Sequence, residues 1–172
     1  MSIDTDYFKK IRILDGGMGQ ELLARGLITK GTLWSASSLI DEKNHHLVID
    51  THLSFINAGA DVILTNSFTT RRVRMNQNQV NNYFNFANKK AGELAVKARE
   101  ISKKEILIAG SLPAQNDTYQ VDKRENHIIE KDFFDQAEII NPYIDFFYLD
   151  VISSGREIEI AIKVIEKLNK PV

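Results

Sequence analysis

Residues 11–20 have the sequence IRILDGGMGQ, an apolar run that leads into Asp15-Gly16-Gly17-Met18-Gly19. The run Ile11–Leu14 is rich in the residues that favour strands, and an acid with three glycines follows it directly. Glycines leave backbone N–H groups bare and let a ligand approach the chain closely. The stretch therefore predicts a strand that ends at a small-ligand site.

Two more strand-like runs end in polar or small residues. Asp61–Thr65 leads into Asn66-Ser67-Phe68, and Glu105–Ala109 leads into Gly110-Ser111. Parallel strands of α/β proteins bring their carboxyl ends to one edge, where ligands bind. The three strand ends are thus expected to form one active-site face. A fourth run, Asp145–Leu149, ends in Asp150.

The stretches between these runs have helical periodicity, which gives the alternation expected of an α/β fold built from parallel βα units. We predict helices over Lys43–Ala58, Gln79–Lys103, Lys131–Ile140 and Glu157–Leu168, with Pro171-Val172 as the start of a fifth strand. No linker divides the chain, so residues 1–172 are predicted to form a single domain of about four βα units. Such units build either an open doubly wound sheet or a (β/α) barrel, and periodicity does not choose between them.

The composition narrows the classes of partner. The 172 residues include 22 basic and 23 acidic ones, mixed along the chain, for a net charge of −1. This balance indicates no nucleic-acid or membrane-surface partner and favours small molecules or protein. No apolar run reaches the roughly 20 residues of a membrane span, and Met1–Lys10 lacks the apolar core of a signal peptide, so a cytoplasmic location is expected. The absence of cysteine excludes disulfides, thiolate metal sites and cysteine nucleophiles within these residues.

Each candidate residue also has a purely structural interpretation. The glycines fit neither the dinucleotide nor the Walker pattern, and an ordinary turn explains them as well as a ligand cradle does. Asn66 or Ser67 could cap a helix. Asp150 is either a functional acid, whose pKa burial would raise, or a helix cap. Structural or solvent-exposed roles are expected for the four histidines and a core or pocket position for the single tryptophan: His45, His46, His52, His127 and Trp34.

Several of these segments, taken together, resemble the N-terminal part of the homocysteine S-methyltransferase family. The similarity lies in Ile13–Gly19, Leu33–Ser35 and Asn57–Phe68 and continues through Ala109–Pro113 and Asp145–Asp150. It implies the N-terminal half of a (β/α)8 TIM barrel and transfer of a methyl group to the thiol of homocysteine, giving methionine. The family's donors include betaine, S-methylmethionine, and methylfolate by way of cobalamin. Zinc held by three cysteines keeps the thiol ionised.

The resemblance also assigns roles to residues of this chain. It implies that Asp15, Gly16 and Gly17 line the homocysteine pocket and that Thr65, Asn66 and Ser67 shape its wall. Asp150 stands where the family has a glutamate that holds the substrate's amino group, so its carboxylate is retracted by about one methylene.

The family's zinc cysteines would all lie beyond Val172, so no residue of this chain is assigned to zinc. We therefore expect no zinc-dependent methyl transfer by the isolated chain. Half a barrel would also leave two unpaired sheet edges and an uncovered inner face. Three interpretations stay open: a truncated or split methyltransferase, an amino-acid-binding module completed by a second copy or a partner chain, and a non-catalytic remnant.

Overall fold

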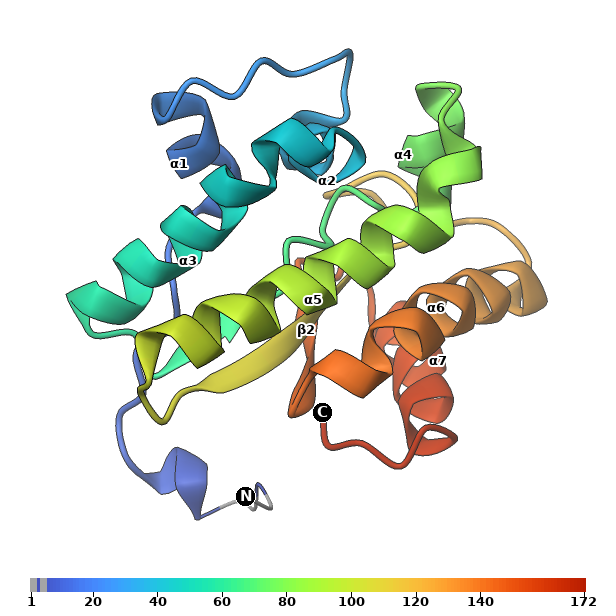
Figure 1. Cartoon of the computed structure of the whole chain (residues 1–172). Helices are drawn as coiled ribbons and strands as arrows, with labels where there is room; N and C mark the ends of the chain where they lie inside the picture. Colours follow the sequence, from blue (N-terminus) through green and yellow to red (C-terminus); the bar gives the residue numbers. More distant parts are fainter. Residues whose placement is uncertain (1–2, 4–5) are drawn as a thin grey trace.

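Three parallel strands form the sheet at the centre of the molecule (Figure 1). The computed structural model describes residue 3 and residues 6–172, so residues 1, 2, 4 and 5 of the segment considered for a signal peptide lie outside the described part. Strands β1 (Val62–Leu64), β2 (Leu107–Pro113) and β3 (Phe146–Asp150) pair in the order β1-β2-β3. The predicted α/β class with parallel βα units is confirmed.

The first predicted strand is reduced to a single bridge at the edge of this sheet. Leu14 pairs with Val62 in parallel, and the N–H of Asp15 donates to the carbonyl of Val62 at 2.9 Å. The N–H of Ile13 instead donates to the side-chain carboxylate of Asp61. Because a side chain takes the place of a backbone acceptor there, the ladder stops at Leu14. At the other edge, the N–H of Phe147 donates to the carbonyl of Pro171 at 2.8 Å, beside the predicted start of the fifth strand.

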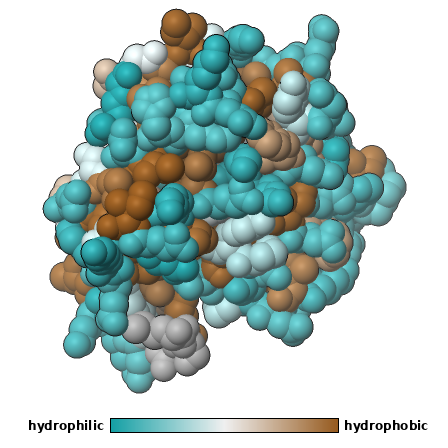
Figure 2. All heavy atoms as spheres, in the orientation of Figure 1, coloured by the Kyte–Doolittle hydropathy of each residue, from teal (hydrophilic) through white to brown (hydrophobic). Residues whose placement is uncertain are grey.

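Four long helices cover one face of the sheet. Helices α3 (His45–Ala58), α5 (Phe84–Ser102), α6 (Asn126–Ile140) and α7 (Gly155–Glu166) contact one another in that order and correspond to the four predicted ones. Ile108, Leu112 and Phe147 of the sheet meet Phe133 and Val164 of the helices in the largest buried apolar cluster. The outer surface of this layer is mostly hydrophilic (Figure 2). No helix of the described residues is long and apolar enough to span a bilayer.

All four helices begin at other residues than the sequence predicts, α3 and α7 by two residues and α5 and α6 by five. Helix α6 starts at Asn126 instead of Lys131, because Ile129 is fully buried and draws the extra turn onto the core. Helix α5 starts at Phe84 because the left-handed backbone of Gln79, at φ 58°, breaks the predicted helix after its first residue.

Strand β2 is longer than expected. The segment Gly110–Pro113, which follows the predicted strand Glu105–Ala109, continues the strand and pairs with β3, with Ser111 opposite Tyr148. Gly110 lets the side chains of α6 and the following turn pack closely on the strand, since a Cβ there would lie 2.6 Å from Cδ1 of Ile144. The strand thus carries Ser111 to the carboxyl edge of the sheet.

Shorter elements surround this carboxyl edge, and the sequence does not predict them because they are too short to show a period. They are α1 (Met18–Ala24), α2 (Ser37–Ile40) and α4 (Arg72–Gln77), together with the 3-10 turns Trp34–Ala36, Glu42–Asn44 and Asn81–Tyr83. Two further 3-10 turns, Tyr7–Lys9 near the N-terminus and Asn141–Tyr143 just before β3, lie away from this edge.

The inner face of the sheet is partly covered, contrary to the expectation that half a barrel leaves it bare. Tyr7 packs against the cluster that Leu107 and Phe146 form on this face, and the ring of Phe8 meets that of Phe146 edge-on at 5.6 Å. The N-terminal segment therefore shields part of the apolar surface that the interior of a closed barrel would bury.

Candidate active site

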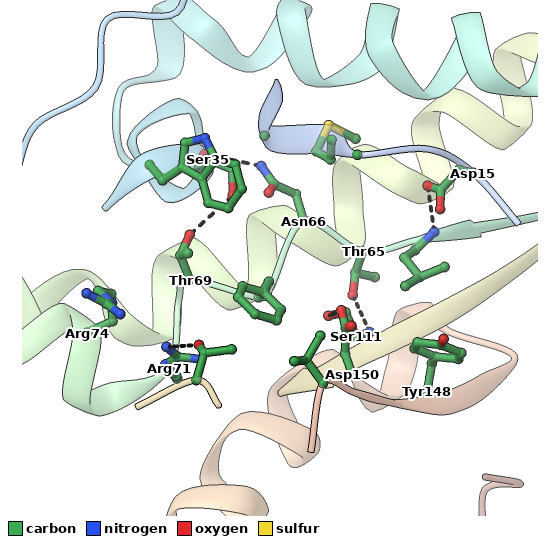
Figure 3. A pocket seen from close by; sticks show the side chains of 18 of the residues that line it. Asp15, Ser35, Thr65, Asn66, Thr69, Arg71, Arg74, Ser111, Tyr148 and Asp150 are labelled. Atoms are coloured by element: carbon green, nitrogen blue, oxygen red, sulfur yellow. Dashed lines mark hydrogen bonds between the residues drawn. The ribbon is translucent and has the colours of Figure 1, made fainter. Parts of the chain in front are cut away.

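A cavity of about 600 Å³ opens at the carboxyl ends of the strands, where the sequence places its candidate residues (Figure 3). Its wall combines the glycine stretch, the segment after β1 and the end of β3. The lining residues used below are Asp15, Gly16, Gly17, Gly19, Trp34, Thr65, Asn66, Phe68, Thr69, Arg71, Arg74, Ser111, Thr118, Tyr148 and Asp150. Six of the seven predicted site residues lie on this wall, and Ser67 does not.

Asp15 lies at the end of the first predicted strand and is held by the sheet. Its Oδ2 accepts a hydrogen bond from the N–H of Leu64 at 2.9 Å. Burial raises the pKa of Asp15 to about 7, against the lowering effect of that hydrogen bond, and the negative charge of Asp150 raises it further. Near neutral pH the carboxyl group is therefore close to half ionised, which suits a group that gains its charge when a cation binds.

Asp150 enters the same cavity from the end of β3. Its Oδ2 accepts a hydrogen bond from Oγ of Ser111 at 2.7 Å. Burial raises the pKa of Asp150, as the apolar strand before it predicts, while the Ser111 bond lowers it. The capping alternative is wrong, since the N-cap of α7 is Ser154, whose Oγ accepts from the N–H of Glu157. The cavity thus holds two carboxylates whose ionised forms burial disfavours.

The glycines serve close packing at two positions. A Cβ on Gly16 would lie 2.7 Å from Cε1 of Phe55, and a Cβ on Gly19 would lie 2.5 Å from Cε2 of Trp34. Gly17 has room for a side chain, with its nearest neighbour at 4.0 Å. The glycine stretch therefore lets an α3 aromatic and Trp34 approach the cavity wall.

The segment after β1 is fixed by a buried hydroxyl network. Oγ1 of Thr65 accepts from the N–H of Ser111 at 3.0 Å and shares a hydrogen bond with Oγ of Ser67 at 2.8 Å. Ser67 in turn donates to the carbonyl of Ser111 at 2.7 Å. Ser67 is fully buried behind the wall. It was expected to shape the wall of the pocket, but it instead supports Thr65 from behind. Neither Ser67 nor Asn66 caps a helix, because α4 begins at Arg72.

Asn66 reaches the opposite side of the cavity. Its Nδ2 donates to the carbonyl of Ser35 and to Oγ of Ser38. Thr69 makes a parallel link, since its Oγ1 accepts from the N–H of Ala36 at 3.1 Å. These bonds tie the β1 end to the Trp34 turn.

Several lining residues gave no decisive signal in the sequence. Trp34, expected in the core or a pocket, lines the cavity with 36% of its surface exposed and has a left-handed backbone at φ 47°. The sequence gives no signal that would place Arg71, Arg74 or Tyr148 in the site. The pair of arginines belongs to the charged run Arg71-Arg72-Val73-Arg74, and nothing in the run shows which side chains turn inward.

A model of the family described as homocysteine S-methyltransferase matches residues 12–172. The chain belongs to the homocysteine S-methyltransferase family.

Individual relatives are similar to shorter stretches of the chain. Homocysteine S-methyltransferase 2 of Saccharomyces cerevisiae is 32% identical over 82 residues, which are 43% of this chain and 25% of that protein. Homocysteine S-methyltransferase 4 of Zea mays is 43% identical over 56 residues, 33% of this chain and 16% of that protein. The matched segments thus span a quarter or less of these two curated relatives.

The fold resembles that of a solved family structure. The metallated form of the homocysteine methyltransferase MmuM from Escherichia coli superposes with a TM-score of 0.81 at 23% identity, covering 97% of this chain and 63% of that one. Its apo form gives a TM-score of 0.70 at 24% identity, covering 95% and 59%. The half-barrel expectation is confirmed at the level of the fold: this chain has the βα units of one part of the barrel.

The residues of this family member do not fit a metal centre. The chain has no cysteine, and among the residues that the structure describes no three His, Cys, Asp or Glu side chains gather closely enough to hold an ion. His52 is fully buried on α3, with neither ring nitrogen bonded, and burial lowers its pKa to about 3. His45 binds the carbonyl of Leu39 through Nε2. Both have structural positions, as the sequence predicts.

Proposed function

We propose that this chain forms the homocysteine-binding part of a homocysteine S-methyltransferase and serves methyl transfer to the thiol of homocysteine, giving methionine. The observation that carries the proposal is the pair of carboxylates, Asp15 and Asp150, that share one cavity at the carboxyl ends of the strands. Family membership supplies the substrate class. The cytoplasm is the proposed location.

The amino group of homocysteine is the part that these carboxylates suit. An ammonium ion between Asp15 and Asp150 would offset the burial that mainly raises the pKa of Asp15 and the smaller effect of the Asp150 charge, and would favour the ionised form of both groups. Hydrogen bonds from Leu64 and Ser111 already orient the two carboxylates. Asp15, Gly16, Gly17, Thr65, Asn66 and Asp150 are the proposed contacts, and Ser67 holds the wall behind Thr65.

The transfer itself needs an ionised sulfur and an in-line methyl group. A sulfur lone pair forms the new S–C bond, while the bond from the methyl carbon to the donor breaks and its electron pair leaves with the donor. A free thiol, with a pKa of about 8.5, is mostly protonated at neutral pH. The proposed work of this chain is to fix the amino acid so that its sulfur faces the donor's methyl carbon.

No step is assigned to a metal on this chain, because its residues do not fit one. We propose that the cysteines of a zinc site come from outside residues 1–172, in a further segment or in a partner chain of different sequence, since a second copy of these residues would add no cysteine. The same lack of cysteine favours a second candidate, a module that binds an amino acid without catalysis.

Calorimetric titration of the purified chain with homocysteine tests the proposal. We expect Asp15→Asn to weaken binding by about 10-fold or more, because a hydrogen bond to a charged group contributes about 1.5–3 kcal/mol. Asp50→Asn, at an exposed position on α3, is the matched control and should bind like the wild type. Equal affinity of the wild type and Asp15→Asn would remove Asp15 from the site.

Homocysteine methylation separates the two candidate functions. Adding a chain that supplies the missing metal ligands should restore methylation by a split methyltransferase. A binding module would take up homocysteine under the same conditions and form no methionine.

A further inference from the structure

Two arginines line the cavity at the end opposite Asp15. Figure 3 shows Arg71 and Arg74 on one side of the view and Asp15 on the other. Among the described residues, neither arginine forms an ion pair, since none of the observed salt bridges includes them. The cavity thus has a basic end at the arginines and an acidic end at Asp15, with Asp150 between them in this view.

Arg71 is buried, and its neighbours satisfy only part of its hydrogen-bonding capacity. It is 1% exposed and ranks first among the largest fully buried side chains. One terminal nitrogen donates to the carbonyl of Ala114 and the other to Oγ1 of Thr118 at 2.9 Å. Its Nε is buried without a partner. Burial lowers the pKa of Arg71 to about 10, so the group stays charged at neutral pH.

Arg74 adds a second unpaired positive charge. Its side chain makes no hydrogen bond with any residue that the structure describes, and its Nε is buried. Its charge acts on Arg71, lowering the pKa of that group, while Asp117 has a smaller opposite effect. The guanidinium groups of Arg71 and Arg74 therefore place two like charges at the same end of the cavity, and a bound anion would stabilise them.

The neighbouring Arg72 differs from Arg71 and Arg74 in having carboxylate partners, although its Nε is likewise buried without a hydrogen bond. Its guanidinium pairs with Asp135 at 2.6 Å and lies 3.9 Å from the ring centroid of Phe84. Holding the loop at Ala114 and Thr118 accounts for the two terminal nitrogens of Arg71. It leaves the Nε of Arg71 and the whole of Arg74 without a structural role.

We propose that Arg71 and Arg74 form a subsite for the carboxylate of the methyl donor. The inference rests on the proposed function and adds the place of the second substrate. A guanidinium presents its N–H donors in a planar fork that matches a carboxylate. A cavity of about 600 Å³ is of the size that holds a drug-sized ligand, which leaves room for a donor beside homocysteine.

The carboxylate of homocysteine itself is the less suitable occupant. Its carboxylate and ammonium are bonded to the same carbon, so an ammonium held by Asp15 and Asp150 keeps that carboxylate at the acidic end. The two ends can therefore bind two different molecules.

Calorimetry with betaine and S-methylmethionine tests the subsite. Arg74→Gln is the main variant, because its side chain has no bond to lose, and Arg25→Gln, which breaks only a surface pair with Glu21, controls for net charge. We expect Arg74→Gln to weaken the donor that the wild type binds by about 10- to 100-fold and Arg74→Lys to restore part of the affinity. Homocysteine affinity should stay unchanged in all three variants.

Matched probes distinguish whether the arginines bind the carboxylate of the methyl donor or that of homocysteine. Weaker homocysteine binding by Arg74→Gln, with unchanged binding of decarboxylated homocysteine (3-aminopropane-1-thiol), would overturn the proposal and assign the arginines to the amino acid. Binding of no donor by the wild type, or equal donor affinity in the wild type and Arg74→Gln, would also overturn it. Donor binding that depends on Arg74 in a chain that fails to bind homocysteine would support the subsite and contradict the proposed function instead.

Discussion

Asp15 has one environment with two consequences, and the first concerns binding. Its pKa of about 7 means that lowering the pH protonates the group that is proposed to hold an ammonium ion. If the complex stays ionised, the Kd for homocysteine at pH 5 should exceed that at pH 8 by up to about 100-fold. Asp150, whose pKa burial also raises, shifts the dependence in the same direction. Titrations at both pH values check this, and a Kd that does not change would contradict it.

The second consequence concerns stability. Folded Asp15 binds a proton up to about pH 7, whereas the unfolded group releases it near its ordinary value of 3.8. Between these values the folded state holds more protons, so the contribution of Asp15 to the free energy of unfolding falls as the pH rises from about 4 to 7. The neutral Asp15→Asn keeps an oxygen for the N–H of Leu64 and avoids this loss. Its gain in stability should be larger at pH 8 than at pH 5 in urea unfolding.

Single residues also show how much of the candidate site could be predicted from the sequence. Asp15 and Asp150 were predictable because each is an acid directly after an apolar run, and the backbone alone carries both to the carboxyl edge. Arg71 was not, because its inward position depends on the turn between β1 and α4. Ser67 was predicted on the wall, but its hydroxyl turns toward Ser111.

At the scale of elements, the contact of α1 with the Trp34 turn gives a test. A Cβ on Gly19 would lie 2.5 Å from the indole ring, so Gly19→Ala must displace Trp34 from the cavity wall. Overpacking of this kind costs about 1–3 kcal/mol, which lowers the Tm by about 2–12 °C in a chain of this size.

Gly155→Ala is the matched control for that substitution. Gly155 opens α7, and nothing lies within 4 Å of the Cβ that it would gain. Its Tm should be unchanged or slightly higher, since alanine favours helix. An equal loss of Tm in both variants, by differential scanning calorimetry, would show that the close approach of Gly19 and Trp34 has no special cost.

The four long helices were predictable because each lays a periodic apolar face on the sheet, while α1, α2 and α4 escape prediction since seven or fewer residues show no period. Prediction from the sequence also fails at the edge of the sheet. The apolar run Ile11–Leu14 indicates a strand, yet the carboxylate of Asp61 takes the N–H of Ile13 and leaves one bridge. A long-range side-chain contact of this kind has no local signal.

At the scale of the whole molecule, a chain that forms only part of a barrel leaves an edge of its sheet without a partner strand. No strand of the described residues pairs with the outer edge at Leu14, and Ile11, three residues before Leu14, is 94% exposed. An unpaired edge with apolar side chains is a template for another strand. We therefore expect the purified chain to self-associate through this edge in sedimentation experiments.

A charge at the edge should oppose that association. Burying an isoleucine contributes about 1.5–3 kcal/mol, so Ile11→Lys should raise the dissociation constant of the dimer by about 10- to 100-fold. Ile28 is 86% exposed but lies in the loop after α1, so Ile28→Lys should leave the association unchanged. Sedimentation velocity over a range of concentrations distinguishes the variants. A monomeric wild type would show that the bridge at Leu14 closes the edge sufficiently, and an equal effect of both lysines would assign the association to general surface hydrophobicity.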